Sequence, residues 1–299
     1  MLSTRELAEY LNINEKQVYK LIRAKKIPAS RITGKWTFPK RLIDQWIIQN
    51  AEENIRGARS DQRLQNHIIA MGSNDFAMDV LTHELTRQFP DYSMSLANVG
   101  SIGGMVALGR GICHIAACHL FDPASGTYNV PYLKQYLPDK SVCLVNLVYR
   151  DLGLIVRAGN PKKISGVADL ARPDITFINR QQGSGTRMFL DAELTRVGLG
   201  GQELQGYERE VATHNETALA VLSGSADAGL GISSAAKMLH LDFVFLTREK
   251  YDLVILKDNL SRPPIAALLG IVRSAEYRKK IHDMGGYDTQ HSGTVIDPQ

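Results

Sequence analysis

The chain has 299 residues, of which 44% are hydrophobic and 22% are charged. This length and composition predict a globular protein with two or three lobes. No apolar run approaches the roughly 20 residues that span a bilayer, and the N-terminus lacks the apolar centre of a signal peptide, so we expect a cytoplasmic protein without membrane contact. Cys113, Cys118 and Cys143 show no CxxC spacing, which predicts reduced, packed thiols and not a metal site or a disulfide framework.

The net charge of +4 is concentrated at the N-terminal end of the chain. Residues 1–50 hold ten basic and four acidic side chains, a difference of +6, so the rest of the chain carries −2. A basic head on a nearly neutral body indicates that the head alone meets a polyanion.

Two short helices are predicted at the start of the chain. Ser3 followed by Glu6 fits a capping box, and Asn14 can cap a second helix after a short break. Apolar residues at helical spacing give each helix an inner face, whereas the outer face of the second helix is basic and polar. Two helices joined by a tight turn in this way predict a helix-turn-helix.

A hairpin and a third helix follow. Gly34 marks the turn of the hairpin, Pro39 ends it, and residues 41–49, RLIDQWIIQ, have a helical pattern. With the motifs S-x-x-E-L-A-x-x-L, V-Y-x-L-I-R and G-K-W-x-F, residues 1–48 resemble the winged helix-turn-helix of the excisionase/MerR type. The resemblance implies a domain over residues 1–50 that binds double-stranded DNA. The alternative is a basic helix pair that makes only protein contacts.

Side chains on the second helix and the wing are the candidates for DNA contact. Cations reach phosphates, and Gln17 or Arg23 could read base edges, while Trp36 and Trp46 are expected in the core. The candidates are Lys16, Gln17, Tyr19, Lys20, Arg23 and Lys35. Residues 51–65 are polar with mixed charge and predict a linker. Because one short module covers little DNA, we expect a homodimer, whose contact lies outside the linker because the linker has no heptad repeat.

From residue 66 to residue 299, short apolar runs alternate with helical patterns. This alternation predicts parallel sheets with helices on both faces, arranged in two lobes. The strands around Leu147–Arg157 and Tyr251–Leu256 are expected to cross between the lobes. Sheets of this kind bind ligands at the carboxyl ends of their strands.

Three predicted strand-to-helix junctions carry hydroxyl groups and glycines. Glycine lets a ligand approach the backbone, and the N–H groups of the first helical turn point at it. The candidate ligand-binding residues at these junctions are Ser73, Asn74, Ser101, Ser184, Gly185 and Thr186. Three converging helix N-termini of this kind predict a site for a small anion.

Four further residues lie near these junctions. Arg187 is either a clamp for the ligand or a member of a surface ion pair, and His119 either faces the cleft or is a satisfied structural histidine. Asn215 is favoured as a helix cap, although its junction also falls at a cleft-facing strand end. Asp75 is expected at a helix N-terminus, facing solvent.

Five segments of the body carry a second resemblance. They are NRQQGSGTRMFLDAEL, HLFDPASGTYNVPYL, YRDLGLIVRAGNP, SGSADAGLGI and EKYDLVI. They are similar to the periplasmic-binding-protein-like domain attached to molybdate- and molybdopterin-related proteins. The resemblance implies an α/β fold: a two-lobed, type II periplasmic-binding-protein-like domain preceded by a small winged helix-turn-helix domain. Tungstate and molybdate receptors are distant relatives in that group.

A fully deprotonated oxyanion is the expected ligand, with molybdate or tungstate favoured over phosphate. The candidate residues are rich in donors, and phosphate keeps a proton near neutral pH that would need an acceptor. Asp75 is the residue that could supply one. Sulfate meets the same electrostatic demand, and only pocket size separates it from the larger anions.

No catalytic constellation is convincing in the sequence. Ser184 lacks the first glycine of the GxSxG elbow, and no HExxH motif occurs. We therefore expect no enzyme, no metal centre and no cofactor, but a one-component transcription regulator that binds DNA and senses a small oxyanion. The alternatives are an adaptor in molybdenum cofactor synthesis and a regulator that senses an organic metabolite, which a wider cleft with apolar walls would favour.

Overall fold

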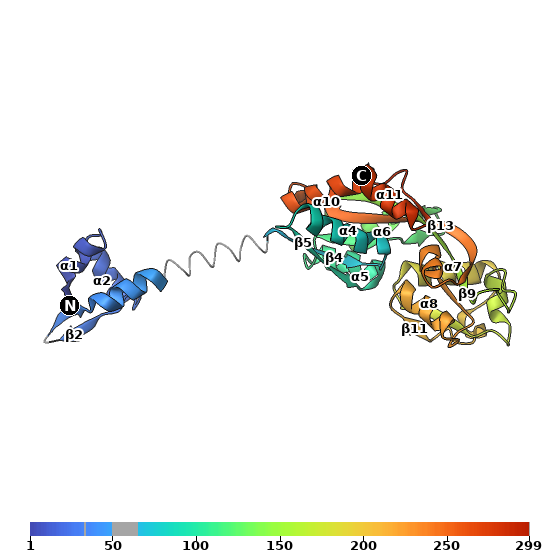
Figure 1. Ribbon diagram of the computed structural model, residues 1–299, viewed down its shortest axis with the longest axis horizontal. Helices are drawn as coiled ribbons and strands as arrows, with labels where there is room; N and C mark the ends of the chain where they lie inside the picture. The colour runs from blue at the N-terminus through green and yellow to red at the C-terminus, as the bar shows by residue number, and fades with distance from the viewer. Residues whose placement is uncertain (33, 50–64, 299) are drawn as a thin grey trace. The chain divides into compact units, whose positions relative to one another are not determined.

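The computed structural model of the protein describes residues 1–32, 34–49 and 65–298 (Figure 1). The chain divides into two compact units, Met1–Gln65 and Asn66–Gln299. The predicted linker lies outside the described residues except for Gln65. No helix of the described part is both long and apolar enough to cross a membrane.

The N-terminal unit is a helix-turn-helix with a small sheet. Its elements are β1 (Leu2–Ser3), α1 (Thr4–Tyr10), α2 (Glu15–Arg23), β2 (Ser30–Ile32), β3 (Lys35–Phe38) and a helix over residues 40–49. The three strands are antiparallel in the order β1-β3-β2. Both predicted helix starts are confirmed, because Ser3 and Asn14 each form a capping box. Gly34 makes the hairpin turn with a φ of 82°, a conformation that suits glycine.

A compact core holds this unit together. Leu7, Val18, Phe38 and Ile43 are fully buried, and Trp36 and Trp46 pack against the same cluster. Helix α2 turns Val18 inward and leaves its basic side chains at the surface. The unit therefore presents a polar, basic helix on a small hydrophobic support, as the sequence predicts.

The C-terminal unit has two lobes on one continuous sheet (Figure 1). The sheet runs in the order β11-β10-β12-β9-β13-β6-β4-β5, with β14 and β15 beside β9. The strands of the first lobe are β4 (His67–Gly72), β5 (Ser93–Asn98) and β6 (Ile115–Cys118), and those of the second are β10 (Phe177–Arg180), β11 (Glu210–Val211) and β12 (Ala228–Ile232). Within each lobe these three strands are parallel.

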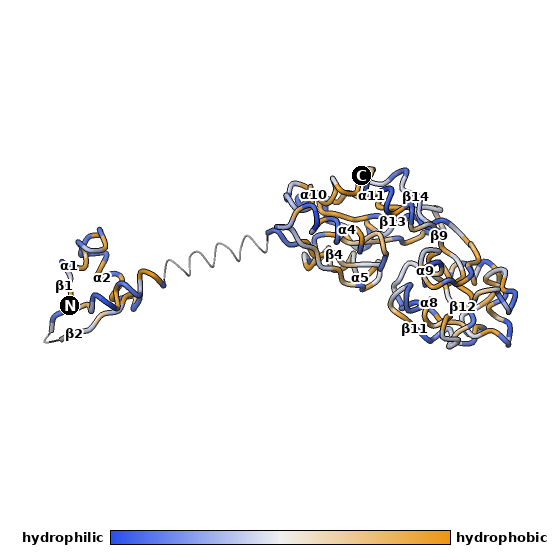
Figure 2. Tube along the Cα trace, viewed as in Figure 1, coloured by the Kyte–Doolittle hydropathy of each residue, from blue (hydrophilic) through white to orange (hydrophobic). Residues whose placement is uncertain are grey.

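Helices cover both lobes, and each lobe has its own buried apolar core (Figure 2). The helices of the first lobe are α4 (Phe76–Gln88), α5 (Gly100–Gly109), α6 (Val130–Tyr136), α10 (Pro263–Arg273) and α11 (Ala275–Asp283). Those of the second are α7 (Gly185–Arg196), α8 (His214–Leu222) and α9 (Ser233–Met238). Short elements complete the unit: β7 (Phe121–Asp122), β8 (Thr127–Tyr128), β14 (Tyr287–Asp288), β15 (Val295–Ile296) and the 3-10 turns Val167–Ala171, Gly201–Glu203 and Lys257–Asn259.

Two long antiparallel strands join the lobes, β9 (Val142–Val156) and β13 (Asp242–Leu256). The strands predicted to cross between the lobes, around Leu147–Arg157 and Tyr251–Leu256, are longer in the structure, although charged residues interrupt each apolar run. The structure continues each strand through the interruption, since Arg150 on β9 lies opposite Glu249 on β13 and the two charges pair. The register shifts at residues 245–247 and 251–252, so an irregularity lies on either side of this pair in β13.

Candidate functional site

The lobes touch where helices α5 and α7 begin. A Cβ built on Gly100, the first residue of α5, would lie 3.0 Å from the backbone oxygen of Gly183. A Cβ on Gly185, the first residue of α7, would lie 2.6 Å from the backbone oxygen of His119. Missing side chains at these glycines let the two helix N-termini meet. The lobes are therefore closed over the predicted junctions.

Aromatic side chains from the first lobe bury this junction further. Phe121, on the small β7-β8 hairpin, packs edge-on against Phe189 of α7, with 6.3 Å between ring centroids. Phe76, the first residue of α4, belongs to the buried cluster of the second lobe. These contacts bury apolar surface between the lobes and so stabilise the closed arrangement.

Arg150 is fully buried between two carboxylates. Its Nε lies 2.5 Å from Glu249 Oε1, its Nη1 lies 2.5 Å from Asp75 Oδ2, and Nη1 also donates to the Asn74 carbonyl at 3.2 Å. Asp75 is only 1% exposed and caps α4. The expectation that Asp75 faces solvent is therefore wrong, because Arg150, distant in sequence, supplies the charge that permits its burial.

A chain of hydrogen bonds runs from Glu249 through His119 to Ser73. His119 Nδ1 lies 2.9 Å from Glu249 Oε2, and His119 Nε2 lies 2.8 Å from Ser73 Oγ. Burial raises the pKa of Glu249, but the charge of Arg150 and the hydrogen bond with His119 outweigh it and lower that pKa to about 2. Burial lowers the pKa of His119, against the opposing influence of Glu249. This order of acid, imidazole and hydroxyl can hold or move a proton at Ser73 Oγ.

Arg180 ends strand β10 in the second lobe and is 1% exposed. Its Nη1 lies 2.7 Å from His214 Nδ1, and its Nη2 donates to the Ala212 carbonyl at 2.8 Å. Among the described residues, no carboxylate lies within ion-pair distance of it. Burial and the nearby charge of Arg150 lower the pKa of Arg180 to about 9. Burial, Arg180 and Arg150 likewise hold the pKa of His214 well below its usual range, so this ring is neutral.

Four buried polar atoms of this region have no hydrogen-bond partner within the described part of the chain. They are Arg150 Nη2, Arg180 Nε, Thr186 Oγ1 and His214 Nε2. The two guanidinium nitrogens only donate, and His214 Nε2 carries the ring hydrogen because Nδ1 accepts from Arg180. Each buried donor left unpaired costs about 1–3 kcal/mol. A set of buried donors without acceptors has the chemistry of an anion site.

The predicted hydroxyl residues lie where the two lobes meet. Ser73, Ser101, Ser184 and Thr186 are all buried. Ser101 Oγ accepts from the backbone N–H of His119 at 3.3 Å, and Ser184 Oγ accepts from the backbone N–H of α7 as its N-cap. Both hydroxyls are acceptors inside the protein, which leaves their O–H groups to donate.

Two predicted ligand-binding residues lie in other surroundings. Arg187 Nη1 contacts Glu210 Oε1 at 3.0 Å, which favours the ion-pair interpretation of this residue. Asn215 is exposed, and Thr213 caps α8 in its place. The expected capping role of Asn215 is therefore wrong, and the neighbouring His214 is the residue that turns inward.

Arg150, Arg180, His214 and Glu249 were missed from the sequence. The available signal was a charge inside an apolar run, as in VCLVNLVYRDLGLIV and DFVFLTREKYDLVIL. Charged side chains are almost never fully buried unless they are paired. A charge in the middle of a buried strand therefore indicates a partner or a ligand, although it does not say which.

The DNA-contact candidates lie at the surface of the N-terminal unit. All six are exposed, and those on α2 lie opposite the buried Val18. Gln17 also closes the capping box, since its Oε1 accepts from the backbone N–H of Asn14 at 3.1 Å. This contact holds Gln17 against the helix start and leaves only its NH2 group for a base. Lys20 and Arg23 make no ion pair with any described residue.

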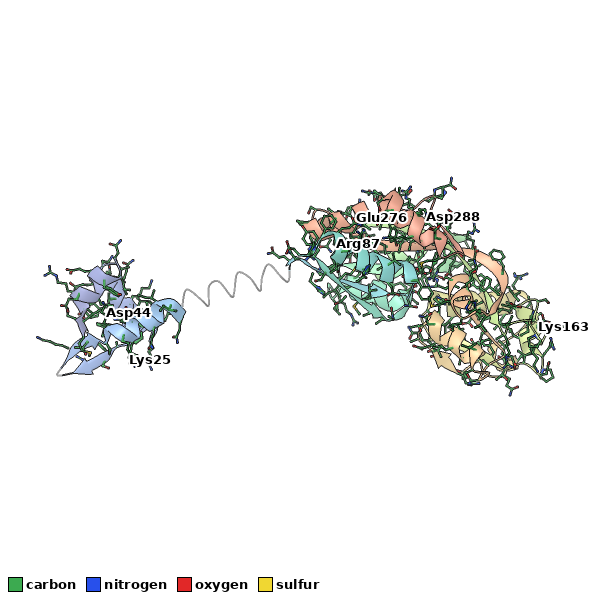
Figure 3. The ribbon with its side chains drawn as sticks, viewed as in Figure 1. Lys25, Asp44, Arg87, Lys163, Glu276 and Asp288 are labelled. Carbon is green, nitrogen blue, oxygen red and sulfur yellow. The ribbon has the colours of Figure 1, made fainter. Side chains whose placement is uncertain are left out.

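Ion pairs elsewhere follow the ordinary pattern of a protein surface. Arg87 and Glu276, labelled in Figure 3, lie 2.8 Å apart with both side chains about half exposed. No group of three or more His, Cys, Asp or Glu side chains in residues 1–32, 34–49 and 65–298 is placed to hold a metal ion. The buried charges between the lobes are thus distinct from the surface pairs in both setting and partners.

Fold and site together define a two-lobed ligand-binding domain that follows a helix-turn-helix domain. The chain belongs to the PBP superfamily, whose domain model matches residues 82–273, and a helix-turn-helix domain model matches residues 1–51. Both resemblances seen in the sequence are confirmed at this level. The two domains are of ligand-binding and DNA-binding types.

Relatives and solved structures agree with this assignment. The chain is 34% identical over 301 residues to "Uncharacterized protein YvgK" of Bacillus subtilis, covering 97% of this chain and 96% of that one. It resembles the structure of a protein described as a phosphate ABC transporter substrate-binding protein, with bound phosphate, from Clostridium perfringens (17% identity, 73% of this chain, 98% of that chain, TM-score 0.55). It also resembles the tungstate ABC transporter structure from Geobacter sulfurreducens (15%, 73%, 98%, TM-score 0.53). At these identities the structures show the fold.

Proposed function

We propose that the protein is a one-component transcription regulator that binds duplex DNA with its N-terminal domain and senses a small oxyanion between the lobes of its C-terminal domain. The observation that carries the proposal is the set of unpartnered buried donors around Arg150, Arg180 and His214. Groups of this kind bind a buried anion with charge-assisted hydrogen bonds. Their polarity favours an oxyanion over the organic metabolite considered from the sequence.

Coupling to DNA requires that the ligand bind two conformations unequally. The donors belong to different parts of the domain: Arg150 lies on a crossing strand, whereas Arg180, Thr186 and His214 belong to the second lobe. An anion held by all of them favours the closed arrangement over an open one. We propose that this difference changes DNA affinity, and that the active form is a homodimer with two heads on neighbouring half-sites.

The argument for molybdate or tungstate over phosphate rested on Asp75 facing solvent. Asp75 is instead buried and bonded to Arg150, so its position no longer supports that preference. We therefore propose the tetrahedral oxyanion as the ligand class on the strength of the donors alone. Phosphate, sulfate, molybdate and tungstate then become competing members of this class.

Fluorescence anisotropy on the full chain tests the proposal. The probe is labelled duplex DNA from upstream of the gene that encodes this chain, titrated with protein alone and then with each of the four anions at saturation. We expect binding that one anion changes by about 5- to 150-fold, the range of typical allosteric couplings. DNA binding that no anion alters would contradict the sensing role, and no DNA binding at low salt would contradict the regulator.

A further inference from the structure

The chain Glu249–His119–Ser73 determines where protons lie in the proposed anion site. Glu249 also contacts Arg150 through Oε1, so its carboxylate is ionised and can only accept hydrogen bonds. The hydrogen between Glu249 and His119 therefore belongs to His119 Nδ1. In a neutral ring Nε2 is then bare, and it must accept the hydroxyl hydrogen of Ser73 at 2.8 Å.

Ser73 is fixed by this arrangement on every side. Its hydroxyl hydrogen is directed at His119, its backbone N–H donates to the Ala117 carbonyl at 2.9 Å, and its carbonyl accepts from the hydroxyl of Tyr251. What Ser73 Oγ has left is lone pairs, so towards a further group it can only accept. Ser73 is thus an acceptor next to Asn74, whose carbonyl contacts Arg150.

We propose that Ser73, held by His119 and Glu249, is the specificity-determining residue of the anion site and selects a tetrahedral oxyanion that carries one proton. The proposal rests on the proposed function and names the protonation state of its ligand. Hydrogen phosphate has the required chemistry, because its P–O–H group donates to Ser73 Oγ while its other oxygens accept from the arginines. Sulfate, molybdate and tungstate carry no hydrogen at neutral pH. Each would place an anionic oxygen against the lone pairs of Ser73 Oγ, which cannot form a hydrogen bond with it.

A fully deprotonated oxyanion can bind only if His119 takes up a proton. Protonated Nε2 then donates to Ser73 Oγ, and the Ser73 hydroxyl hydrogen is released to donate to the anion. The groups that face His119 are Glu249 and Tyr251 on β13, Arg150 on β9, Ser73 after β4, Ser101 on α5, and, from the second lobe, the charged Arg180 and the neutral ring of His214. Burial and the two arginines oppose this protonation, and Glu249 favours it. The free-energy cost of protonating His119 therefore weakens the binding of such anions near neutral pH.

Isothermal calorimetry on the full chain tests the proposal without any substitution. Phosphate and sulfate are titrated near neutral pH in two buffers of different ionisation enthalpy. We expect phosphate to bind tighter by about tenfold or more, the value of one unpaired buried group, with no proton taken up by the protein. Sulfate should bind with uptake of close to one proton, and its affinity should rise as the pH falls.

Two matched variants separate the acceptor from the donors. Ser73→Ala removes the acceptor, so the preference for phosphate over sulfate should fall by about tenfold or more. Thr186→Val removes a hydroxyl that serves either anion as a donor, so both affinities should fall and their ratio should stay. A ratio unchanged in Ser73→Ala, or sulfate binding as tight as phosphate with no proton uptake, would overturn this inference alone. No binding of either anion, or of molybdate, by the unaltered chain would overturn the proposed function as well.

Discussion

The two sides of the proposed anion site each contain a fully buried arginine, and their surroundings differ. Arg150, on the crossing strand β9, pairs with Asp75 and Glu249. Arg180, at the end of β10 in the second lobe, pairs with a neutral histidine and a backbone carbonyl and has no carboxylate within reach in the described chain. The charge of Arg150 is balanced by carboxylates of the protein itself, whereas that of Arg180 is not.

The comparison distinguishes a charge that stabilises the protein, that of Arg150, from a charge that is available to a bound anion, that of Arg180. Taking an ion out of water costs several kcal/mol unless a counter-charge and hydrogen bonds replace the solvent. Arg150 receives both from the protein, so it can hold the first lobe, the crossing strands and His119 in place. Arg180 receives hydrogen bonds but no counter-charge, and a bound anion would supply what it lacks. Two predictions test this distinction, and two more concern lobe closure and the N-terminal domain.

The largest expected effect is that of Arg150→Met on stability. Removing the guanidinium leaves the buried carboxylates of Asp75 and Glu249 without a cation, and breaking a buried pair in this way costs about 3–5 kcal/mol. We expect the free energy of unfolding, measured by urea denaturation at neutral pH, to fall by that amount. Arg180→Met is the matched control, since no described carboxylate loses its partner. It leaves His214 Nδ1 and the Ala212 carbonyl without a donor, so its change should be smaller, about 1–3 kcal/mol. Equal losses in the two variants would contradict the distinction.

The second prediction concerns stabilisation by the ligand. Phosphate at 100 times its dissociation constant should stabilise the unaltered chain by about 2.7 kcal/mol, visible as a rise in Tm. Arg180→Met removes charged donors worth about 1.5–3 kcal/mol each, so at the same concentration most of this rise should disappear. Burial lowers the pKa of Arg180 to about 9, which is still above neutral pH, so its charge is present where the titration is made. A rise in Tm that is the same in Arg180→Met would place the anion elsewhere.

Most of the fold could be predicted from local sequence patterns. Capping at Ser3 and Asn14, the glycine turn of the wing and the alternating strands and helices of the body all depend on neighbouring residues. The long strands β9 and β13 extend beyond the predicted crossing segments and carry Arg150 and Glu249 inside otherwise apolar runs, where an unpaired charge is costly to bury. Only their pairing across the sheet removes that penalty, and local patterns do not contain it.

The site could be predicted only where it follows chain-local rules. Ser73, Ser101 and Ser184 were found because hydroxyl residues at strand-to-helix junctions are recognisable in sequence. Asp75 was misplaced and Arg180 was missed for a common reason. The burial of Asp75 depends on Arg150, which is distant in sequence. The setting of Arg180 depends on His214, also distant in sequence, and no described carboxylate lies within ion-pair distance of it. Such long-range charge balance is visible only in three dimensions.

The third prediction tests lobe closure at Gly185. A methyl group on this residue would lie 2.6 Å from the backbone oxygen of His119 and 2.8 Å from its ring, so Gly185→Ala should oppose the closed arrangement. Overpacking of this kind costs about 1–3 kcal/mol, which we expect as a loss of phosphate affinity of about 5- to 150-fold in calorimetry. Gly270→Ala, where nothing lies within 4 Å of the added Cβ, is the control and should bind normally. Unchanged affinity in Gly185→Ala would mean that the anion does not require closure.

The smallest expected effects are those of Lys20→Ala and Arg23→Ala in the N-terminal domain. Lys20 and Arg23 are exposed cations without an ion-pair partner in the described chain, so, like Arg180, they have charge to offer a partner, here the DNA backbone. Each should contribute one phosphate contact, so Lys20→Ala and Arg23→Ala should each lower DNA affinity and reduce by about one the slope of log affinity against log salt. If Arg23 reads a base edge, its variant should also lose about 1–3 kcal/mol of sequence preference, which Lys20→Ala should retain. Lys134→Ala, an exposed lysine of the C-terminal domain, removes the same charge and should leave both quantities unchanged. Anisotropy titrations at several salt concentrations measure all three variants, and equal slopes in all of them would show that α2 is not the helix that meets DNA.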